Sequence, residues 1–355
     1  MKKKILTAVI PAFLVFMLVM AAQTTDARQA SAGWVPDVLG EPFEQRTFEM
    51  EPDYEGDVVV TLVRRLVNPG QPSEKAVLYV HGFNDYFFQA EMAERFNAEG
   101  LDFYAVDLRK YGRSWRPHQK ITNVRDLSEY YADLDLGLNY IREAGASQIV
   151  LKGHSTGGLT TTLYAADRKG MGLFDALLLN SPFFDFNAGF FMRRFAIPFI
   201  AWRGGSNPDK LTPEGEPGFY GASIYAGEQG EWDFNTEWKG SGVRLNYGWI
   251  RAIRQGHRRV ARGLEIDVPV LVMHSDKTVP ENELSDVLFT GDSVLNVAHI
   301  KAGAGNLRSP DLRLAEIENG MHDLILSREP VRNEAYRVMM AWVRELRGDE
   351  ASPAP

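Results

Sequence analysis

The feature that most constrains the fold of this chain is a repeated alternation of short apolar runs with longer segments of helical spacing. The predicted strands are Asp57–Val67, Ala76–Val80, Phe103–Val106, Ile149–Leu151, Asp175–Leu179, Val268–Met273 and Leu312–Ile317. The predicted helices are Tyr86–Glu99, Asp126–Gly145, Leu159–Arg168, Val294–Lys301 and Val331–Leu346. Strands that alternate with helices indicate a mostly parallel central sheet, covered by helices on its faces.

The alternation is interrupted once, from 182 to 263. This stretch is rich in Gly and Pro and holds nine of the twenty Phe and four of the seven Trp of the chain. We therefore expect an insertion there, within a core formed by 57–181 and 264–348. The segment 33–56 is predicted to be an arm on the surface, and 349–355 a flexible tail.

The first 32 residues have the layout of an export signal. Lys2, Lys3 and Lys4 precede an uncharged apolar run from Ile5 to Ala22, and small and polar residues follow. The run is longer than an ordinary signal core and reaches the lower range of a membrane-spanning helix. Residues 1–32 are thus predicted to be a cleaved signal peptide or a retained membrane anchor, and the protein to be exported.

Composition limits the classes of partner and cofactor. The formal net charge of −8 argues against nucleic acid. The chain has no cysteine, so no disulfide and no thiolate metal site can form. The histidines lack the spacing of metal ligands, so no metal is expected. Contact with a membrane surface and the oligomeric state are left open by the sequence.

The strongest chemical signal is Gly153-His154-Ser155-Thr156-Gly157, a Gly-x-Ser-x-Gly pattern between a predicted strand and a predicted helix. A sharp turn at this junction holds the serine in a strained conformation, and glycines on both sides avoid clashes with the flanking elements. Ser155 is therefore the predicted nucleophile. The alternative is an ordinary glycine-rich turn that opens a helix.

A serine hydroxyl needs a base that removes its proton, and that base is a histidine late in the chain. His322 directly follows the last predicted strand and precedes the last predicted helix. The alternative role of a single loop histidine is a solvated surface residue. Its position after the final strand favours His322 as the catalytic base.

The acid that orients the histidine has two candidates. Asp276 ends the strand that contains Val270–Ser275, and Asp292 follows after an excursion from Thr278 to Gly291. A strand-end position next to the nucleophile favours Asp276 on topology. Asp292 has an alternative role as the N-cap of the following helix. The residues alone leave both open.

Acyl transfer also needs backbone amides that stabilise the developing oxyanion. One donor is expected after the strand that ends at His81-Gly82-Phe83, and the other directly after the nucleophile. Phe83 and Thr156 are therefore the predicted oxyanion-hole residues.

These motifs together resemble the monoacylglycerol lipase and lysophospholipase branch of the α/β-hydrolases, the group also called serine aminopeptidase-like. The resemblance covers roughly Val58 to Leu346. It is carried by His81-Gly82-Phe83, by Asp107 to Ser114, by Gly153 to Gly157 and by Gly320-Met321-His322. The second of these is similar to an Asp-x-x-Gly-x-Gly-x-Ser pattern, with Lys110 in place of the first glycine.

The resemblance implies the α/β-hydrolase fold and changes the choice of acid. The family's acid opens a helix about thirty residues before the histidine, and Asp292-Ser293-Val294-Leu295 has that form. The implied triad is Ser155, Asp292 and His322, with Thr278 to Gly291 as an insertion in a loop. The 182–263 insertion occupies the position of the family's lid over an acyl pocket.

The implied activity is hydrolysis of an ester with an apolar acyl chain, of lysophospholipid or monoacylglycerol type, without a cofactor. A second reading is a peptidase that removes N-terminal residues, which needs acidic groups near the substrate amine. The insertion supplies acidic residues for this reading, namely Glu228, Glu231, Asp233 and Glu237. A third reading is a non-catalytic binding protein on the same fold.

Overall fold

The computed structural model describes residues 33–213, 218–346 and 348. The predicted export signal, 1–32, and the predicted tail, 349–355, lie outside these residues, so both stay predictions. Within the described part of the chain, no helix is long and apolar enough to cross a membrane.

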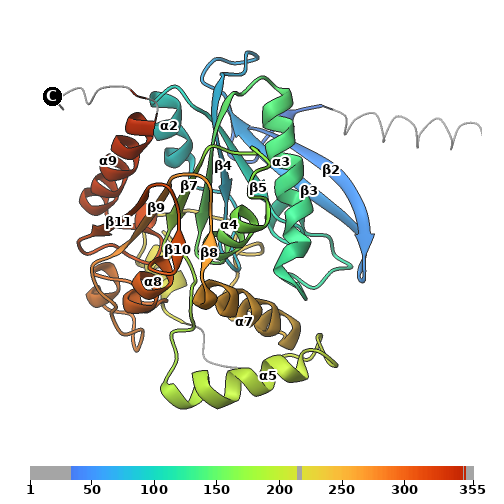
Figure 1. Cartoon of the computed structure of the whole chain (residues 1–355), viewed down its shortest axis with the longest axis vertical. Coiled ribbons are helices and arrows are strands. Elements are labelled where there is room, and N and C mark those ends of the chain that lie inside the picture. Colours follow the sequence, from blue (N-terminus) through green and yellow to red (C-terminus); the bar gives the residue numbers. More distant parts are fainter. Residues whose placement is uncertain (1–32, 214–217, 347, 349–355) are drawn as a thin grey trace, which may run out of the picture.

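The centre of the molecule is a nine-stranded sheet with the order β1-β2-β3-β5-β4-β6-β7-β9-β11 (Figure 1). Its strands are β1 Val35–Pro36, β2 Glu44–Asp53, β3 Gly56–Arg65, β4 Lys75–Val80, β5 Asp102–Asp107, β6 Gln148–His154, β7 Ala176–Asn180, β9 Val270–Ser275 and β11 Leu312–Ile317. The pairs from β5 to β11 are parallel, whereas β1, β2 and β3 join antiparallel at the other edge. A separate short parallel pair joins β8 Leu264–Glu265 and β10 Leu307–Arg308.

Helices cover both faces of the sheet, and others belong to the 182–263 insertion. They are α2 Ala90–Ala98, α3 Tyr131–Glu143, α4 Thr156–Asp167, α5 Ile197–Arg203, α6 Tyr220–Ile224, α7 Tyr247–Arg262, α8 Val297–Ala304 and α9 Glu329–Leu346. Short helical turns, with 3₁₀ or π geometry, lie at Gly112–Ser114, Leu127–Tyr130, Met192–Ala196, Asp286–Phe289 and Leu324–Leu326. Apolar residues of α3, α4, α7 and α8 share one core, and those of α2 and α9 share another.

Strand β4 shows why two cores form. Successive side chains of a strand point to opposite faces of the sheet. Leu78 and Val80 accordingly lie in the core under α3 and α4, and Val77 and Tyr79 in the core under α2 and α9. All four are fully buried, as expected for a parallel strand covered on both sides.

The predicted surface arm is wrong for much of its length, because Glu44–Asp53 is strand β2, paired antiparallel with β3. Its side chains are only half-buried or exposed, so the segment lacks the apolar run that marked the other strands. A partly exposed strand near the edge of a sheet needs few apolar residues, which is why composition suggested an arm.

Two predicted helices begin later than expected. The first begins at Ala90 rather than Tyr86, because the Phe87 amide donates to the Asp107 carboxylate (3.0 Å) and holds a loop there. The second begins at Val297 rather than Val294, because Asn296 caps it through the Ala298 amide.

The described residues of the 182–263 insertion contribute no strand to the sheet and form loops, the π-helical turn and helices α5, α6 and α7. Figure 1 shows α5 and α7 together at one end of the molecule, beyond the sheet. The insertion leaves the sheet after β7 and returns to it before β9.

Candidate active site

Ser155 lies at the turn between β6 and α4, where the sequence predicted it. Its φ of 53° and ψ of −116° belong to a strained conformation for a residue with a side chain. The flanking glycines are required by space. A Cβ on Gly153 would lie 2.4 Å from the Thr161 hydroxyl, and one on Gly157 would lie 2.2 Å from the His81 carbonyl oxygen. The turn therefore depends on both glycines.

Three of the predicted site residues form one hydrogen-bonded chain. The Ser155 Oγ lies 3.0 Å from the His322 Nε2. The His322 Nδ1 lies 3.1 Å from the Asp292 Oδ2. An ionised carboxylate can only accept hydrogen bonds, so the His322 Nδ1 carries a proton and donates a hydrogen bond to Asp292. The Nε2 of the neutral ring then accepts the hydrogen bond from the serine hydroxyl. This is the arrangement in which an imidazole removes a proton from serine.

The Asp292 carboxylate has two structural ties. Its Oδ1 accepts hydrogen bonds from the amides of Val294 (2.9 Å) and Leu295 (2.7 Å). Its Oδ2 is thereby left for His322. The aspartate thus stabilises a local turn before α8 and also faces the histidine, but it is not the N-cap of that helix, because Asn296 takes this position.

The segment between the two candidate acids is a loop that returns to the end of β9. Thr278 and Asp292 form an isolated parallel bridge, in which the Val279 amide donates to the Asp292 carbonyl oxygen at 3.0 Å. Residues 279–291 therefore form a loop that leaves and rejoins the end of β9. Asp276 instead accepts a hydrogen bond from the Asn319 amide (2.7 Å) and lies near Lys277. It contacts the loop that carries His322, but not the imidazole.

The two predicted oxyanion donors lie on either side of Ser155. Thr156 is the first residue of α4, so its amide has no acceptor within the helix. The Phe83 amide donates no hydrogen bond to any described residue. A Cβ on the neighbouring Gly82 would lie 3.1 Å from the Ser155 Cβ, which shows how closely this turn approaches the serine.

His81 holds that turn in place. Its Nε2 accepts a hydrogen bond from the Leu108 amide (3.1 Å), so its proton resides on Nδ1. The Nδ1 then donates to the Gly82 carbonyl oxygen at 2.8 Å. These bonds tie the end of β4 to the end of β5.

Lys110, which departs from the family pattern, has a positive φ of 67°. Glycine takes this conformation without strain, which explains the pattern's preference. The lysine side chain is fully buried, with its Nζ 2.6 Å from an Asp53 oxygen and 3.0 Å from a Glu55 oxygen. The Nζ also lies 4.1 Å from the centre of the Tyr54 ring. The substitution thus anchors the β2–β3 hairpin.

A buried polar layer lies behind the serine and histidine, and the sequence interpretation missed it. The Asp323 Oδ1 accepts a 2.6 Å hydrogen bond from the Asn180 amide group. The Asp323 Oδ2 lies 3.9 Å from the His154 Nε2. Burial, with a contribution from His322, lowers the pKa of His154 well below its usual range, so this ring is neutral at pH 7. Its Nδ1 donates to the Asn180 carbonyl oxygen.

Lys152 belongs to the same layer. Burial lowers the pKa of its ammonium group from 10.5 to about 8, against the opposing effect of Asp323. The Nζ makes no hydrogen bond with a described residue and lies 4.7 Å from the centre of the Tyr79 ring. The available sequence signal was a lysine directly after the predicted strand Ile149–Leu151 and three positions before Ser155.

Side chains of the 182–263 insertion contact the site. The Tyr220 ring packs edge-on against His322, with centroids 5.6 Å apart, and its hydroxyl accepts a hydrogen bond from the Asp323 amide. The Trp249 ring of α7 packs on Phe83 at 4.7 Å. Ser155 is only 8% exposed, and His322 4%. The insertion therefore contacts His322 and Phe83.

Among the described residues, no group of three or more His, Asp or Glu side chains is arranged to hold a metal ion. The chemistry available at the site is that of the hydroxyl, the imidazole, the carboxylate and the two amides. This fold and this site geometry are those of the α/β-hydrolase class of proteins.

Comparison with known proteins identifies the family. The pattern described as "Serine aminopeptidase, S33" matches residues 71–329. The chain belongs to this family. Over 126 residues it is also 32% identical to a monoacylglycerol lipase of Mycolicibacterium smegmatis. That stretch covers 35% of the chain and 43% of the relative, so the match spans less than half of the relative's length.

Solved structures share the fold at low sequence identity. A soluble variant of the monoglyceride lipase of Saccharomyces cerevisiae has a TM-score of 0.65 at 15% identity, covering 89% of this chain and 97% of that one. The monoacylglycerol lipase of Paleococcus ferrophilus has a TM-score of 0.60 at 17% identity, covering 78% and 96%. These likenesses confirm the predicted α/β-hydrolase fold.

Proposed function

We propose that this protein is a serine hydrolase that cleaves carboxylic esters with an apolar acyl chain, of monoacylglycerol or lysophospholipid type. The observation that carries the proposal is the hydrogen-bonded chain from Ser155 through His322 to Asp292. The monoacylglycerol lipases among the similar proteins support the substrate class.

The proposed reaction begins with attack of the Ser155 Oγ on the ester carbonyl carbon, while the His322 Nε2 takes the hydroxyl proton. The amides of Phe83 and Thr156 stabilise the negative oxygen that forms. His322 returns the proton to the leaving alcohol as the carbon–oxygen bond breaks. A water, deprotonated by His322, then attacks the acyl-enzyme, and His322 returns that proton to the Ser155 Oγ as the bond to the acyl group breaks and the acid leaves. Asp292 holds the imidazole orientation throughout.

The aminopeptidase alternative is less well supported by the described residues. It needs acidic groups that bind a substrate amine. Glu231 forms ion pairs with Arg328 and Arg332 on the surface. The other three acidic residues named for this role, Glu228, Asp233 and Glu237, are exposed. None of the four is paired with a residue of the triad. The apolar and aromatic contacts around Phe83 and Trp249 suit an acyl chain better.

A substrate comparison tests the proposal. We expect purified protein to hydrolyse p-nitrophenyl esters and monoacylglycerol, with little activity on aminoacyl anilides, and Ser155→Ala to abolish ester hydrolysis. Anilide hydrolysis that exceeds ester hydrolysis would favour the peptidase. Absence of both activities in folded protein would favour the non-catalytic binding protein.

Export of the protein, through residues 1–32 as a signal or anchor, is part of the same proposal. It rests on the three lysines and the apolar run of the sequence alone. Fractionation of producing cells tests it, since retention of all the protein in the cytoplasmic fraction would contradict export. The apparent mass of the exported form would distinguish cleavage from anchoring.

A further inference from the structure

The insertion carries an unusual concentration of exposed apolar side chains. Every exposed Phe and Trp in the described part of the chain lies within 190–202. We name this set the apolar ridge: Phe190, Phe191, Met192, Phe195, Phe199 and Trp202, which are 46% to 78% exposed. Soluble proteins rarely leave so many large apolar side chains together in water without a partner.

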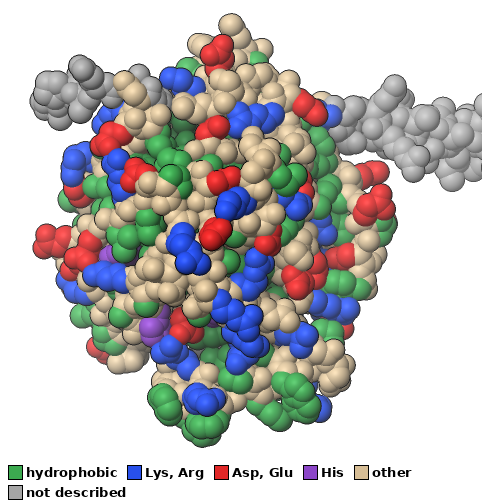
Figure 2. Space-filling model, viewed as in Figure 1, with side chains coloured by type: hydrophobic (Ala, Val, Ile, Leu, Met, Phe, Trp, Pro, Cys, Tyr) green, Lys and Arg blue, Asp and Glu red, His purple; other side chains and the backbone are tan. Residues whose placement is uncertain are grey.

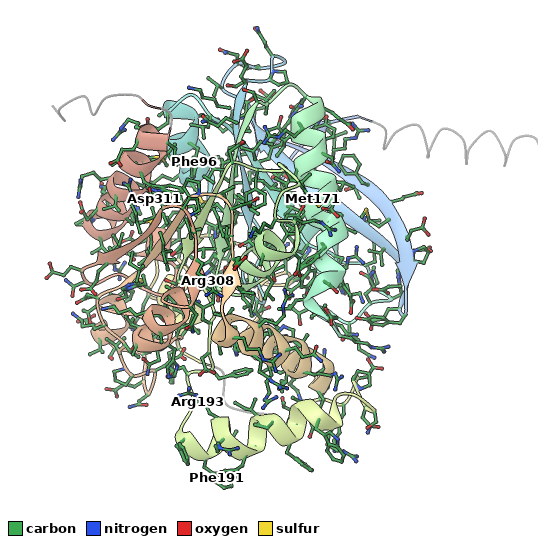
Figure 3. All side chains as sticks on the ribbon, in the orientation of Figure 1. Phe96, Met171, Phe191, Arg193, Arg308 and Asp311 are labelled. Carbon is green, nitrogen blue, oxygen red and sulfur yellow. The ribbon has the colours of Figure 1, made fainter. Side chains whose placement is uncertain are left out.

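The ridge has a regular geometry. Phe191, Phe195 and Phe199 recur at four-residue steps along the π-helical turn and α5, so they share a face. The rings of Phe191 and Phe195 lie 5.3 Å apart, and those of Phe199 and Trp202 lie 5.8 Å apart. Figure 3 shows Phe191 on the outer side of this segment, away from the sheet.

The surroundings of the ridge are basic, although the whole chain has a net charge of −8. Residues 186–208 contain three arginines and no acidic residue, and α7 contains five arginines and no acidic residue. The two segments pack tightly, since a Cβ on Gly204 would lie 2.3 Å from the Tyr247 carbonyl oxygen. Figure 2 shows the apolar atoms at this end of the molecule, with basic side chains beside them.

Most of these arginines have no acidic partner. Arg193 pairs with Asp185, and Arg259 with Asp167. The other six form no ion pair with any residue that the structure describes: Arg194, Arg203, Arg251, Arg254, Arg258 and Arg262. Arginines kept unpaired around exposed aromatic side chains leave a positive field that a negatively charged partner would complement.

We propose that the apolar ridge inserts into the surface of an anionic phospholipid bilayer, with the surrounding arginines on the lipid headgroups. Aromatic side chains that protrude from one helical face suit the fluid boundary between headgroups and acyl chains, and arginines beside them suit anionic lipid. A second copy fits less well. A two-fold interface centred on the ridge would bring the arginines of both copies together.

Binding of the ridge to a bilayer would determine where the proposed active site lies relative to the lipid. The ridge belongs to the same insertion as Tyr220 and Trp249, which contact His322 and Phe83. Docking by the ridge would therefore place the proposed active site beside the lipid phase. Binding itself does not require the reaction, so it is tested with the inactive Ser155→Ala chain, and its failure would leave the proposed function standing.

Because the chain has no cysteine, a single introduced cysteine can report on one position. We would label Phe195→Cys with an environment-sensitive fluorophore, in the full-length Ser155→Ala protein. The matched control is Met171→Cys, which is 58% exposed and lies away from α5 in Figure 3. The probe reads one site, whatever residues 1–32 contribute to binding.

We expect a several-fold increase and a blue shift of the emission at position 195 with vesicles that contain 30% phosphatidylglycerol. Little change is expected at position 171 or with phosphatidylcholine alone. Arg194→Glu with Arg203→Glu should weaken binding at least about tenfold. The proposal is overturned if position 195 stays in water, if both positions respond equally, or if its emission changes with protein concentration without vesicles, which would indicate self-association.

Discussion

At the residue scale, the two oxygens of the Asp292 carboxylate have different partners, which explains why this aspartate faces the histidine. The Val294 and Leu295 amides bind one oxygen and fix the plane of the group. The other oxygen then lies 3.1 Å from His322. Asp276 uses its carboxylate to bind the Asn319 amide and supports only the loop.

Exchanging each acid for its amide separates these roles. We expect Asp292→Asn to lower kcat by about 10³ to 10⁴, because an amide favours the wrong imidazole tautomer. Asp276→Asn keeps an acceptor for the Asn319 amide and should lower kcat by less than about tenfold. Ester hydrolysis by both variants, with circular dichroism to confirm folding, measures this. A larger loss in Asp276→Asn would transfer the acid role to it.

The buried Lys152 predicts a pH dependence of stability. Its pKa is about 8 in the folded protein and near 10.5 in the unfolded chain, so the unfolded chain binds more protons between these values. The free energy of unfolding therefore increases by about 3 kcal/mol through this group as the pH rises from 8 to 10.5. Below pH 8, the buried ammonium group destabilises the folded protein by this full amount.

Lys152→Met removes this pH-dependent contribution to the free energy of unfolding. We expect the stability of the variant, relative to the original protein, to fall by about 3 kcal/mol between pH 8 and 10.5, since only the original gains. Urea denaturation of both proteins across this range gives the difference, in which the other titrating groups cancel. A difference that does not vary with pH would show that Lys152 titrates normally.

The sequence was informative about single residues where their context was local. Ser155 and His322 were identified from their positions beside strands, and the structure brings them within hydrogen-bonding distance. The acid was ambiguous, because the loop 279–291 returns to the end of β9 through a bridge that no local pattern reveals. The resemblance, rather than spacing, pointed to Asp292. The layer of Lys152, Asp323 and Asn180 was missed, because its members meet only in the folded sheet.

At the element scale, the β2–β3 hairpin shows how one substitution connects distant segments. Lys110 follows β5, yet its ammonium group lies between Asp53 and Glu55 at the hairpin turn. In the sequence, the lysine is a departure from the family pattern, and residues 33–56 are predicted to form an arm. The structure relates these two observations. The buried ammonium group of Lys110 needs carboxylate partners, and Asp53 and Glu55 at the turn after β2 provide them.

Removing the lysine should therefore destabilise the fold. We expect Lys110→Met to lower the free energy of unfolding by about 3 kcal/mol, because two partly buried carboxylates lose their counter-ion. Lys120→Met is the control, since Lys120 also approaches Glu55 but is exposed, and its loss should cost less than about 1 kcal/mol. Thermal and urea unfolding test this. Equal effects of the two substitutions would contradict a structural role for the Lys110 pairs.

Strand prediction failed at one edge of the sheet for a physical reason. The central strands are buried on both faces and appear as continuous apolar runs. Strand β2 is half-buried or exposed along its length, so charged residues are tolerated on it. Backbone pairing with β3 defines it as a strand, and the sequence does not display that pairing.

At the scale of the whole molecule, the sheet order brings together residues from three distant parts of the chain. Ser155 follows β6, Asp292 follows β9, and His322 follows β11. In a parallel sheet these ends lie at one edge, so residues that follow different predicted strands can meet in one candidate site. The arrangement of the 182–263 insertion was not predictable in detail, because its aromatic content suits both a covering segment and an exposed apolar surface.

The proposed reaction requires a covalent intermediate on Ser155. Reaction with a fluorophosphonate, followed by intact mass and peptide mapping, tests this requirement. We expect one adduct per chain, located on Ser155, with loss of ester hydrolysis in proportion to labelling. Labelling should vanish in Ser155→Ala and persist in Ser181→Ala, a control at another buried serine hydroxyl. An adduct that persists in folded Ser155→Ala, or absence of any adduct in the original protein, would contradict the proposed reaction.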